Sequence, residues 1–445
     1  MSEQQSGSKA PGKKQPFDPV IVAGVRTPFM RSHKAYVNLS AYDLGRFAIN
    51  GLMAKTGLDP ELPEQVSLGT VIHDPKTSNV ARECVLGAGL PSSVPAYTVS
   101  LACISSNVAA TSLADMIRLK RLNVAIFGGT DTCSDPPIRF SPKLRKALVK
   151  LGNIKKPQDI LKEWSTIKKL RLSDIAPDVP AVAEFSNGKS MGEGAEILAQ
   201  QAGVLREESD RFAERSHQCA VKAQNDGIFL EDLIAVQAPP HFQTIDKDDG
   251  PRADTTFEKL STLRPAFDKK LGVATAGSSS FLTDGASAVL MMSRQRAKEL
   301  GYAPKAVIKD YVYRAGDALS EMLAGPALSV PVLLAKNKLK VSDIGVWEIH
   351  EAFASQVLAN LKYMTMDKFV RDRLGLDKAP GEIPLEKINI WGGSLSIGHP
   401  FGATGGRLLW TASRRLIQEQ QRFAIVTGCA AGGHGSAILL ENPDA

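Results

Sequence analysis

The chain contains 445 residues, 43% of them hydrophobic, and carries a formal net charge of +7. This length predicts about two or three domains, and no uncharged apolar run reaches the roughly 18 residues that a membrane-spanning helix needs. The five cysteines are odd in number and form no CxxC pair, which argues against a zinc site or a disulfide framework and indicates reduced thiols.

The basic residues are concentrated in one segment of the chain. Residues 139–171 contain eleven Lys or Arg and only Asp159 and Glu163, a net charge of +9, so the remaining chain is close to −2. Nucleic-acid-binding domains spread basic residues over a folded face, so this confinement argues against a nucleic-acid partner. The polar residues 1–17 predict a disordered tail that lacks the apolar stretch of a secretory signal, and we expect a cytoplasmic protein.

The first half of the chain alternates apolar strands with amphipathic helices. The strand predicted at 97–106 ends in a turn of small residues, and the one at 123–131 ends in two glycines before Thr130. This alternation predicts a mainly parallel sheet covered by helices. The other elements expected here are a strand at 19–29, a helix at 43–55, a strand at 66–72 and a helix at 107–122.

Residues 134–255 differ in composition and predict an inserted loop domain. The part from 136 to 180 is basic and contains prolines, so only short helical pieces are expected. Residues 207–226 predict an amphipathic helix with acidic residues in its first turn and Gly227 after its end. The charged residues 241–261 predict a loop.

The second half repeats the pattern of the first. A strand runs into a helix at 346–353, and a strand at 388–391 is followed by a glycine-rich turn that reaches residue 406. A helix is predicted at 407–419 and an apolar strand ending in glycines at 423–433. Both halves therefore place a reactive-looking turn, a helix and a strand ending in Gly in the same order, which suggests an internal duplication.

Cys103 is the first candidate for chemistry, because it lies between a predicted strand and a predicted helix. The free N–H groups and dipole of a helix N-terminus stabilise a thiolate, so this position predicts a lowered cysteine pKa. The alternative from position alone is a small core residue in a packed turn.

His399 and Cys429 lie in two glycine-rich turns, GHPFGATGG and CAAGGHG. A histidine held beside Pro400 can deprotonate a thiol, or it can simply bond loop carbonyls. The small residues after Cys429 leave backbone N–H groups unshielded, as an oxyanion hole requires. Neither turn has the GxxxxGK[ST] or GxGxxG spacing of a phosphate-binding loop.

His350 follows a strand in IHEAFA and can polarise a carbonyl directly or through water, or it can cap the helix that follows. The remaining histidines have no comparable context, and we assign them structural or surface roles. They are His73, His217, His241 and His434.

Four motifs in this order and spacing resemble the thiolase family: HEAFA, GHPFGATG, CAAGGHG and the stretch TAGSSSFLTDGASAV at 275–289. The resemblance covers nearly everything from Val20 to Glu441. Three details resemble the β subunits of trifunctional fatty acid oxidation complexes in particular. They are HEAFA where most thiolases have NEAFA, CAAGG in place of the usual CIGGG, and the run CISS. Members of that group are acetyl-CoA C-acyltransferases, also called 3-ketoacyl-CoA thiolases.

The resemblance implies a duplicated α/β/α/β/α layered fold with an inserted loop domain. The N-terminal thiolase domain would span 18–295, including the loop domain at 134–255, and the C-terminal thiolase domain would span 296–445. It also implies that CoA is a substrate, and that the enzyme needs neither a cofactor nor a metal.

The resemblance further implies a role for each candidate residue. Cys103 would attack a 3-ketoacyl-CoA, His399 would take its proton and help hold a thioester oxygen, and Cys429 would protonate the departing enolate. The backbone N–H groups of Cys103 and Ala431 would form an oxyanion hole. His350 stands where most thiolases have an Asn that holds a catalytic water.

The resemblance places Met191 and Ser280 near the pantetheine arm of CoA. It implies a homodimer, and a heterotetramer with an α subunit that carries hydratase and hydroxyacyl-CoA dehydrogenase activities. The basic segment 139–171 has three competing interpretations: a solvated helical face, a surface that attracts CoA phosphates, or a peripheral contact with anionic lipid or a partner subunit.

Rival functions stay open at this point. A biosynthetic acetoacetyl-CoA thiolase is one alternative, although these shorter enzymes fit the motifs less well, and a condensing enzyme of the ketoacyl synthase kind would use one Cys with two His. The second thiol, Cys429, argues against the condensing enzyme. A non-enzymatic scaffold or lipid carrier would need a decayed site, whereas the candidate residues are all present.

Overall fold

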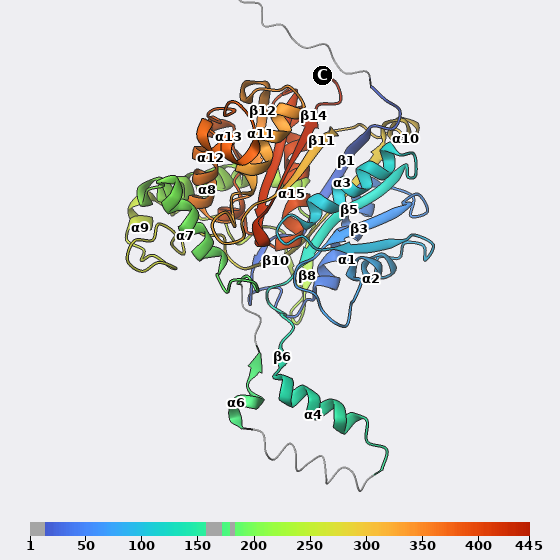
Figure 1. The fold of residues 1–445 in the computed structure, drawn as a ribbon. Helices are drawn as coiled ribbons and strands as arrows, with labels where there is room; N and C mark the ends of the chain where they lie inside the picture. Colours follow the sequence, from blue (N-terminus) through green and yellow to red (C-terminus); the bar gives the residue numbers. More distant parts are fainter. Residues whose placement is uncertain (1–13, 157–170, 179–182) are drawn as a thin grey trace, which may run out of the picture.

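The computed structural model describes residues 14–156, 171–178 and 183–445. Most of the tail predicted at 1–17 and part of the basic segment 139–171 lie outside these residues. The core is a sheet in the order β12-β13-β14-β11-β1-β10-β5-β3-β4, with the short strand β2 (Met30–Arg31) paired to β10 (Figure 1).

The N-terminal half of the sheet carries helices on both faces. Its strands are β1 (Pro19–Arg26), β3 (Gln65–Gly69), β4 (Ala96–Val99), β5 (Val124–Asp131) and β10 (Thr283–Ser293). Its helices are α1 (Ala41–Thr56), α2 (Val80–Gly87), α3 (Ser105–Arg118) and α10 (Arg294–Glu299).

The C-terminal half repeats this plan. Its strands are β11 (Ala306–Ala315), β12 (Ile344–Ile349), β13 (Phe423–Ala430) and β14 (His434–Glu441). Its helices are α11 (Gly325–Lys336), α12 (Ala354–Tyr363), α13 (Asp367–Leu374), α14 (Ser394–Ile397) and α15 (Thr404–Gln418).

Side-chain alternation explains how five layers form. In β10, Leu290 and Met292 pack in the cluster that holds α1 and α2, whereas Val289 and Met291 pack on the opposite side with α3 and α15. Successive strand residues point to opposite faces, so a strand buried on both faces needs helices on each side. With α11 and α12 covering the outer face of the C-terminal half, the predicted α/β/α/β/α layering is confirmed.

The prediction of a mainly parallel sheet is wrong. Only the pairs β3–β4, β3–β5 and β12–β13 are parallel, while every pair that involves β1, β10, β11 or β14 is antiparallel. Antiparallel strands need no crossover helix, so β13 and β14 join through the short turn Ala431–Gly433. In both halves a parallel pair is followed by two antiparallel strands, and this shared order confirms the duplication.

The strand predicted at 388–391 is also wrong, because only Ile388 forms a bridge, to Trp347 of β12. Asn389 has a φ of 45° and leaves the extended conformation. Its side chain accepts a hydrogen bond from the backbone N–H of Ile349 and donates one to the Ile349 carbonyl, so a side chain takes the place of a strand.

The described residues between 134 and 261, which include those of the predicted loop domain, form a compact part and a projecting part. The compact part contains α7 (Met191–Ala202), α8 (Arg206–Asn225), the hairpin β8 (Val236–Ala238) and β9 (Gln243–Ile245), and α9 (Phe257–Ser261). The helix predicted at 207–226 is confirmed, but the loop predicted at 241–261 contains β9 and α9.

The projecting part extends away from the body of the molecule (Figure 1). It contains β6 (Arg139–Phe140), α4 (Pro142–Gly152), α6 (Leu172–Ile175) and β7 (Pro177–Asp178). Across the whole described structure, no helix combines the length and apolar character that spanning a bilayer demands.

Candidate active site

Cys103 lies in a tight turn between β4 and α3, two residues before the helix begins. The Ser105 hydroxyl builds this turn, because it accepts a hydrogen bond from the N–H of Leu101 and donates one to the carbonyl of Ala102. Ala102 takes a φ of 44°, so the chain reverses sharply just before the cysteine. The turn therefore presents Cys103 at the edge of the sheet, where strands from both halves end.

Two histidines from the C-terminal half meet Cys103 there. His350 follows β12, and His399 follows α14. One ring nitrogen of each histidine and the Cys103 sulfur all lie within 4.8 Å of one another. The ring centroids of the two histidines are 4.1 Å apart. Three segments distant in sequence thus converge, as the chemical interpretation of these residues requires.

Cys429 completes the group from the end of β13. It is 1% exposed, and the nearby Cys103 sulfur contributes to raising its pKa. The turn after it places Gly432 and Gly433 at positive φ, a conformation that favours glycine. This turn aims the N–H of Ala431 at the Cys103 sulfur, which also receives the N–H of Cys103 itself. The N–H groups of Cys103 and Ala431, which were predicted to form an oxyanion hole, therefore both point to the Cys103 sulfur.

The structure contradicts the predicted pKa of Cys103. Burial raises the pKa of this thiol to about 12, and the Asp131 carboxylate raises it further. The N–H groups of Cys103 and Ala431 act in the opposite direction but are outweighed, because removing a thiolate from water costs more than two N–H groups return. Burial likewise raises the pKa of Cys429. Both thiols are neutral at rest, so Cys103 needs a base.

Both histidines are neutral as well. Burial and the Arg407 guanidinium lower the pKa of His350 to about 3. Burial, His350 and Arg407 hold the pKa of His399 well below its ordinary value. Nδ1 of His350 lies 3.1 Å from Ser394 Oγ and Nδ1 of His399 lies 2.7 Å from Thr404 Oγ1, whereas each Nε2 has no hydrogen-bond partner among the described residues. Two buried Nε2 atoms are thus available to a substrate.

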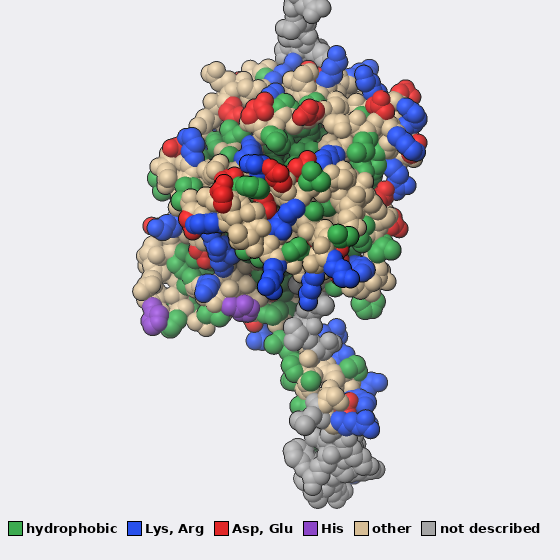
Figure 2. Space-filling model, turned by 90° about the vertical axis from the view of Figure 1, so that its left-hand side faces the viewer, with side chains coloured by type: hydrophobic (Ala, Val, Ile, Leu, Met, Phe, Trp, Pro, Cys, Tyr) green, Lys and Arg blue, Asp and Glu red, His purple; other side chains and the backbone are tan. Residues whose placement is uncertain are grey.

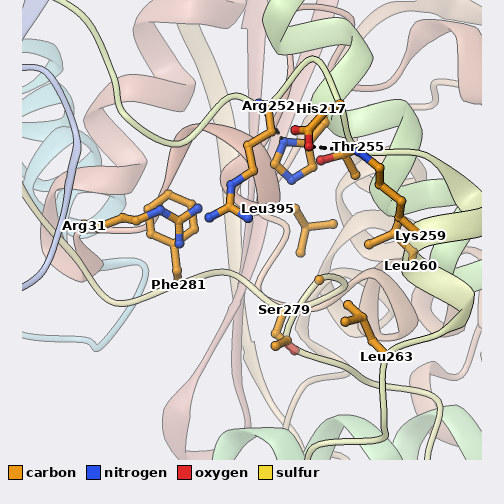
Figure 3. A pocket seen from close by; sticks show the side chains of 13 residues that line it. Arg31, His217, Arg252, Thr255, Lys259, Leu260, Leu263, Ser279, Phe281 and Leu395 are labelled. Carbon is orange, nitrogen blue, oxygen red and sulfur yellow. Dashed lines mark hydrogen bonds and ion pairs between the residues drawn. The ribbon is translucent and has the colours of Figure 1, made fainter.

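A cavity of about 360 Å³ opens beside this group. Figure 3 shows Arg252 and His217 on one wall of the cavity and Arg31 stacked on Phe281, with its guanidinium carbon 3.7 Å from the ring centroid. Lys259 and Asp254 also line the cavity and form an ion pair at 2.9 Å. Leu395 also lines it, next to the Ser394 that bonds His350, so the cavity adjoins the catalytic candidates.

Family models decide where the chain belongs. The model described as "Thiolase, N-terminal domain" matches residues 19–295, and "Thiolase, C-terminal domain" matches residues 302–442. The chain belongs to the thiolase family. A solved structure of the Bacillus anthracis acetyl-CoA acetyltransferase is 30% identical and superimposes with a TM-score of 0.80, covering 96% of this chain and 98% of that one. The expected thiolase fold is confirmed.

Curated relatives of this thiolase extend over nearly its whole length. "Trifunctional enzyme subunit beta, mitochondrial" of Bos taurus is 44% identical over 95% of this chain and 88% of that protein. "Probable 3-ketoacyl-CoA thiolase" of Caenorhabditis elegans is 45% identical over 98% and 96%. "3-ketoacyl-CoA thiolase" of Aliivibrio fischeri is 42% identical over 95% of both chains. The resemblance drawn from the motifs is therefore confirmed.

The two CoA-arm candidates of this thiolase lie near the site but make different contacts. Met191 begins α7 and packs on the apolar cluster that contains Cys429 and Phe353. Ser280 donates its backbone N–H to the carbonyl of Ala352, 2.9 Å away, and its neighbour Ser279, rather than Ser280, lines the cavity.

Sequence reasoning missed Asp131, which holds the His399 turn in place. Its buried carboxylate accepts hydrogen bonds from the N–H groups of Val71, Ile72 and Gly402 and from the Thr70 hydroxyl. The bond to Gly402 is 2.7 Å long and ties the GHPFGATGG turn to the end of β5. The available signal was an acidic residue ending an apolar, fully buried strand.

Sequence reasoning also missed the basic cavity residues. Arg31 ends the two-residue strand β2 and Arg252 lies in a loop, so neither belongs to a periodic pattern that could have given a signal. His217, which received a structural or surface role, is 5% exposed and lines the cavity. Its Nδ1 accepts the backbone N–H of Arg252 and so holds that loop at the cavity wall.

Proposed function

We propose that this thiolase is an acetyl-CoA C-acyltransferase that cleaves medium- or long-chain 3-ketoacyl-CoA with CoA during fatty acid β-oxidation. The products are acetyl-CoA and a shortened acyl-CoA. The observation that carries the proposal is the convergence of Cys103, His350 and His399 next to Cys429. The relatives named 3-ketoacyl-CoA thiolase support this substrate class.

The first half-reaction starts from a neutral thiol. Nε2 of His399 takes the proton of Cys103 as the sulfur attacks the 3-keto carbon. The bond between C2 and C3 then breaks, its electron pair passes into the enolate of acetyl-CoA, and Cys429 gives its proton to C2. The acyl group stays on Cys103 as a thioester, and Cys429 is left as a thiolate.

The second half-reaction returns every proton. The Cys429 thiolate takes the proton of the CoA thiol, and the CoA sulfur attacks the acyl carbon of the Cys103 thioester. The tetrahedral oxyanion lies against the N–H groups of Cys103 and Ala431, the arrangement in which backbone donors stabilise developing charge. Cys103 leaves and recovers its proton from His399, so no cofactor and no metal takes part.

His350 would donate to the thioester oxygen of the acetyl-CoA unit in the first half-reaction, and His399 would help hold that oxygen once its Nε2 has taken the Cys103 proton. Both Nε2 atoms are buried and have no hydrogen-bond partner among the described residues, and the two rings are close together, so one oxygen can contact both. Arg31 and Arg252 would bind the phosphates of CoA in the adjoining cavity, since guanidinium groups pair well with phosphate.

Thioester absorbance tests the proposal. Purified protein, a series of 3-ketoacyl-CoA substrates from short to long chain, and free CoA should give turnover that is highest beyond the four-carbon substrate. Turnover of acetoacetyl-CoA alone would instead identify a biosynthetic thiolase. Condensation without thiolysis would identify a ketoacyl synthase, and no turnover with any chain length would identify a scaffold or carrier.

The assembly and location belong to the same proposal. Relatives named as a trifunctional enzyme subunit support pairing with an α subunit that bears hydratase and dehydrogenase activities, around a thiolase homodimer. We place the protein in the cytoplasm. Co-purification with such an α subunit from the source cells would support the heterotetramer, and a homodimer that captures none would contradict it.

Peripheral lipid contact is the third element of the proposal and rests on the projecting α4. Its charged side chains include Lys146 and Lys150, and Leu148 and Val149 between them are 41% and 64% exposed. Figure 2 shows Lys and Arg side chains gathered along this projection beside hydrophobic ones. No described residue of α4 lines the CoA cavity, so the projection offers its mixed surface elsewhere.

Anionic vesicles provide the test of this surface. Each basic residue near an anionic membrane surface contributes about 1 kcal/mol to the free energy of binding, so the protein should pellet with phosphatidylserine vesicles at low salt. Charge reversal of Lys146 and Lys150 to Glu should reduce pelleting, whereas reversal of the exposed Lys298 and Lys378 on the body should not. Equal losses in both variants, or no pelleting at all, would leave α4 as a solvated helical face.

A further inference from the structure

Arg407 is a buried cation that the proposed mechanism does not use. It lies in the first turn of α15 and is 3% exposed. Among the described residues it joins no ion pair, and its Nε and Nη1 atoms have no hydrogen-bond partner. Burying a guanidinium without a carboxylate against it is unfavourable for folding, so stability alone does not account for this residue.

The nearest carboxylates are already engaged with other groups. Glu348 pairs with Arg415 at 2.8 Å, and Glu351 accepts hydrogen bonds from Asn389 and Ser216. They favour the charged form of Arg407 only through the electric field. Among the described residues, the guanidinium of Arg407 donates one hydrogen bond, from Nη2 to Ser394 Oγ 3.2 Å away.

Ser394 connects Arg407 to His350. A guanidinium has donors only, so the serine oxygen must accept in the bond from Arg407. Ser394 Oγ has one other partner among the described residues, Nδ1 of His350 at 3.1 Å. Nδ1 of His350 is the acceptor that the described hydrogen bonds offer to the hydroxyl hydrogen, and the positive charge of Arg407 disfavours a second N–H donated to the same oxygen, so Nδ1 of His350 accepts. In a neutral imidazole the single ring proton is then on Nε2.

The two histidines differ in this respect. Nδ1 of His399 bonds Thr404 Oγ1, and no charged donor stands behind that hydroxyl among the described residues. The threonine oxygen is free to accept, so His399 can carry its proton on Nδ1 and offer a lone pair at Nε2, as a base for Cys103 must. The relay formed by the hydrogen bonds from Arg407 to Ser394 and from Ser394 to His350 gives His350 the opposite tautomer, with its proton on Nε2.

We propose that Arg407, acting through Ser394, is a positioning residue that fixes His350 as the Nε2–H tautomer, a hydrogen-bond donor and never a base. The inference deepens the proposed function, on which it rests. The two histidines then have different roles. His399 moves the proton of Cys103, and His350 donates a hydrogen bond to the thioester oxygen of the acetyl-CoA unit. The acetyl-CoA enolate would bind less well to a ring with a lone pair in that place.

A double-mutant cycle tests the relay. Ser394→Ala lets the His350 ring carry its proton on either nitrogen, so kcat should fall about 10-fold with little change in KM. This loss is smaller than the roughly 10²–10³-fold fall in kcat expected when an oxyanion donor is removed altogether. His350→Asn lowers kcat itself, but its amide N–H₂ needs no relay to donate. In that background Ser394→Ala should change kcat by less than about 2-fold.

Ser413→Ala provides the matched control. Ser413 is also buried, lies on α15 with Arg407, and donates its hydroxyl hydrogen to the Leu409 carbonyl, so its loss should leave kcat unchanged in both backgrounds. A loss from Ser394→Ala that is equal in both backgrounds would mean that Ser394 is merely structural. No loss in the wild-type background would also overturn the relay.

Nitrogen-15 spectra of histidine-labelled protein test the tautomer without turnover. The chain has 7 histidines, and the His350 signals are those missing from His350→Asn. Wild type should show a protonated Nε2 and an unprotonated Nδ1, and Arg407→Met should show a mixture, while Arg407→Lys, which retains a donor-only cation, should restore the wild-type pattern. A protonated Nδ1 in wild type would refute the inference, and this result is independent of whether the protein performs thiolysis.

Discussion

Cys429→Ala separates two steps that the proposed mechanism assigns to different thiols. Cleavage of a 3-ketoacyl-CoA needs a proton at C2 of the departing acetyl-CoA, and Cys429 supplies it. A saturated acyl-CoA lacks the 3-keto group, so its C2–C3 bond is not cleaved. Its acyl group passes to Cys103 with His399 as the base, and the bond to the CoA sulfur breaks; a thiolate is a much weaker base than an enolate, so CoA can leave without an acid. The variant should therefore lose thiolysis but keep acylation by a saturated acyl-CoA.

The structure sets the size of both effects. Burial keeps Cys429 protonated at neutral pH, so nearly every wild-type molecule carries the acid, and its loss should lower kcat for thiolysis by about 10²–10⁴. Removing one buried sulfur from the apolar cluster around it should cost only about 1 kcal/mol of folding free energy. Acylation by the saturated substrate should stay within about 10-fold of wild type, since its base is untouched.

Two assays read these outcomes separately. Thioester absorbance follows thiolysis, and mass spectrometry of the intact protein shows the acyl group on Cys103. Cys219→Ala is the matched control, because Cys219 is a partly exposed cysteine on α8. Turnover by Cys429→Ala above a tenth of the wild-type rate would refute the assignment of the proton to Cys429. Loss of acylation by the saturated acyl-CoA would show that Cys429 also activates Cys103.

Three further results are expected. The pKa of His350 is lower in the folded protein than its ordinary value of 6.5, so unfolding takes up a proton below pH 6.5 and His350 destabilises the fold only on the acid side. In chemical denaturation of His350→Asn, the free energy of unfolding near pH 5 should therefore change with pH by about 1.4 kcal/mol per unit less than in wild type. Arg252→Ala should raise KM for CoA about 10-fold with kcat nearly unchanged, because it binds ground and transition states alike, while Lys378→Ala should change neither constant. Overnight treatment with a strong chelator should leave kcat intact; if activity is lost and zinc restores it, Cys103, His350 and His399 hold a metal.

The sequence patterns that rest on local physics predicted the fold well. Ser40 and Asp43 form a capping box at the start of α1, and Gly57 ends it with a φ of 63°, so this helix appears where expected. β10 was not anticipated as a strand, because all its residues are buried and no polar alternation marks its period. Its antiparallel pairing with β1 depends on contacts between distant segments, which no local pattern encodes.

The site shows the same division between local and non-local causes. The turn before α3 indicated Cys103 as a candidate reactive thiol, but the sign of its pKa shift depends on burial by both halves of the chain and on Asp131. A helix N-terminus lowers a thiol pKa only while water still solvates the sulfur. The cavity is equally non-local, since Arg31 follows β1 and Arg252 belongs to the inserted residues.

A resting site without charge on its reacting groups has a consequence for catalysis. Neutral thiols do not attract cations or react readily with electrophiles, so Cys103 is protected until a substrate completes the group. The burial that raises the pKa of Cys103 also strengthens each hydrogen bond that the N–H of Ala431 or Nε2 of His350 makes to a developing negative charge. The free energy that disfavours the thiolate at rest would thus be recovered once the charge moves to a substrate oxygen that contacts those donors.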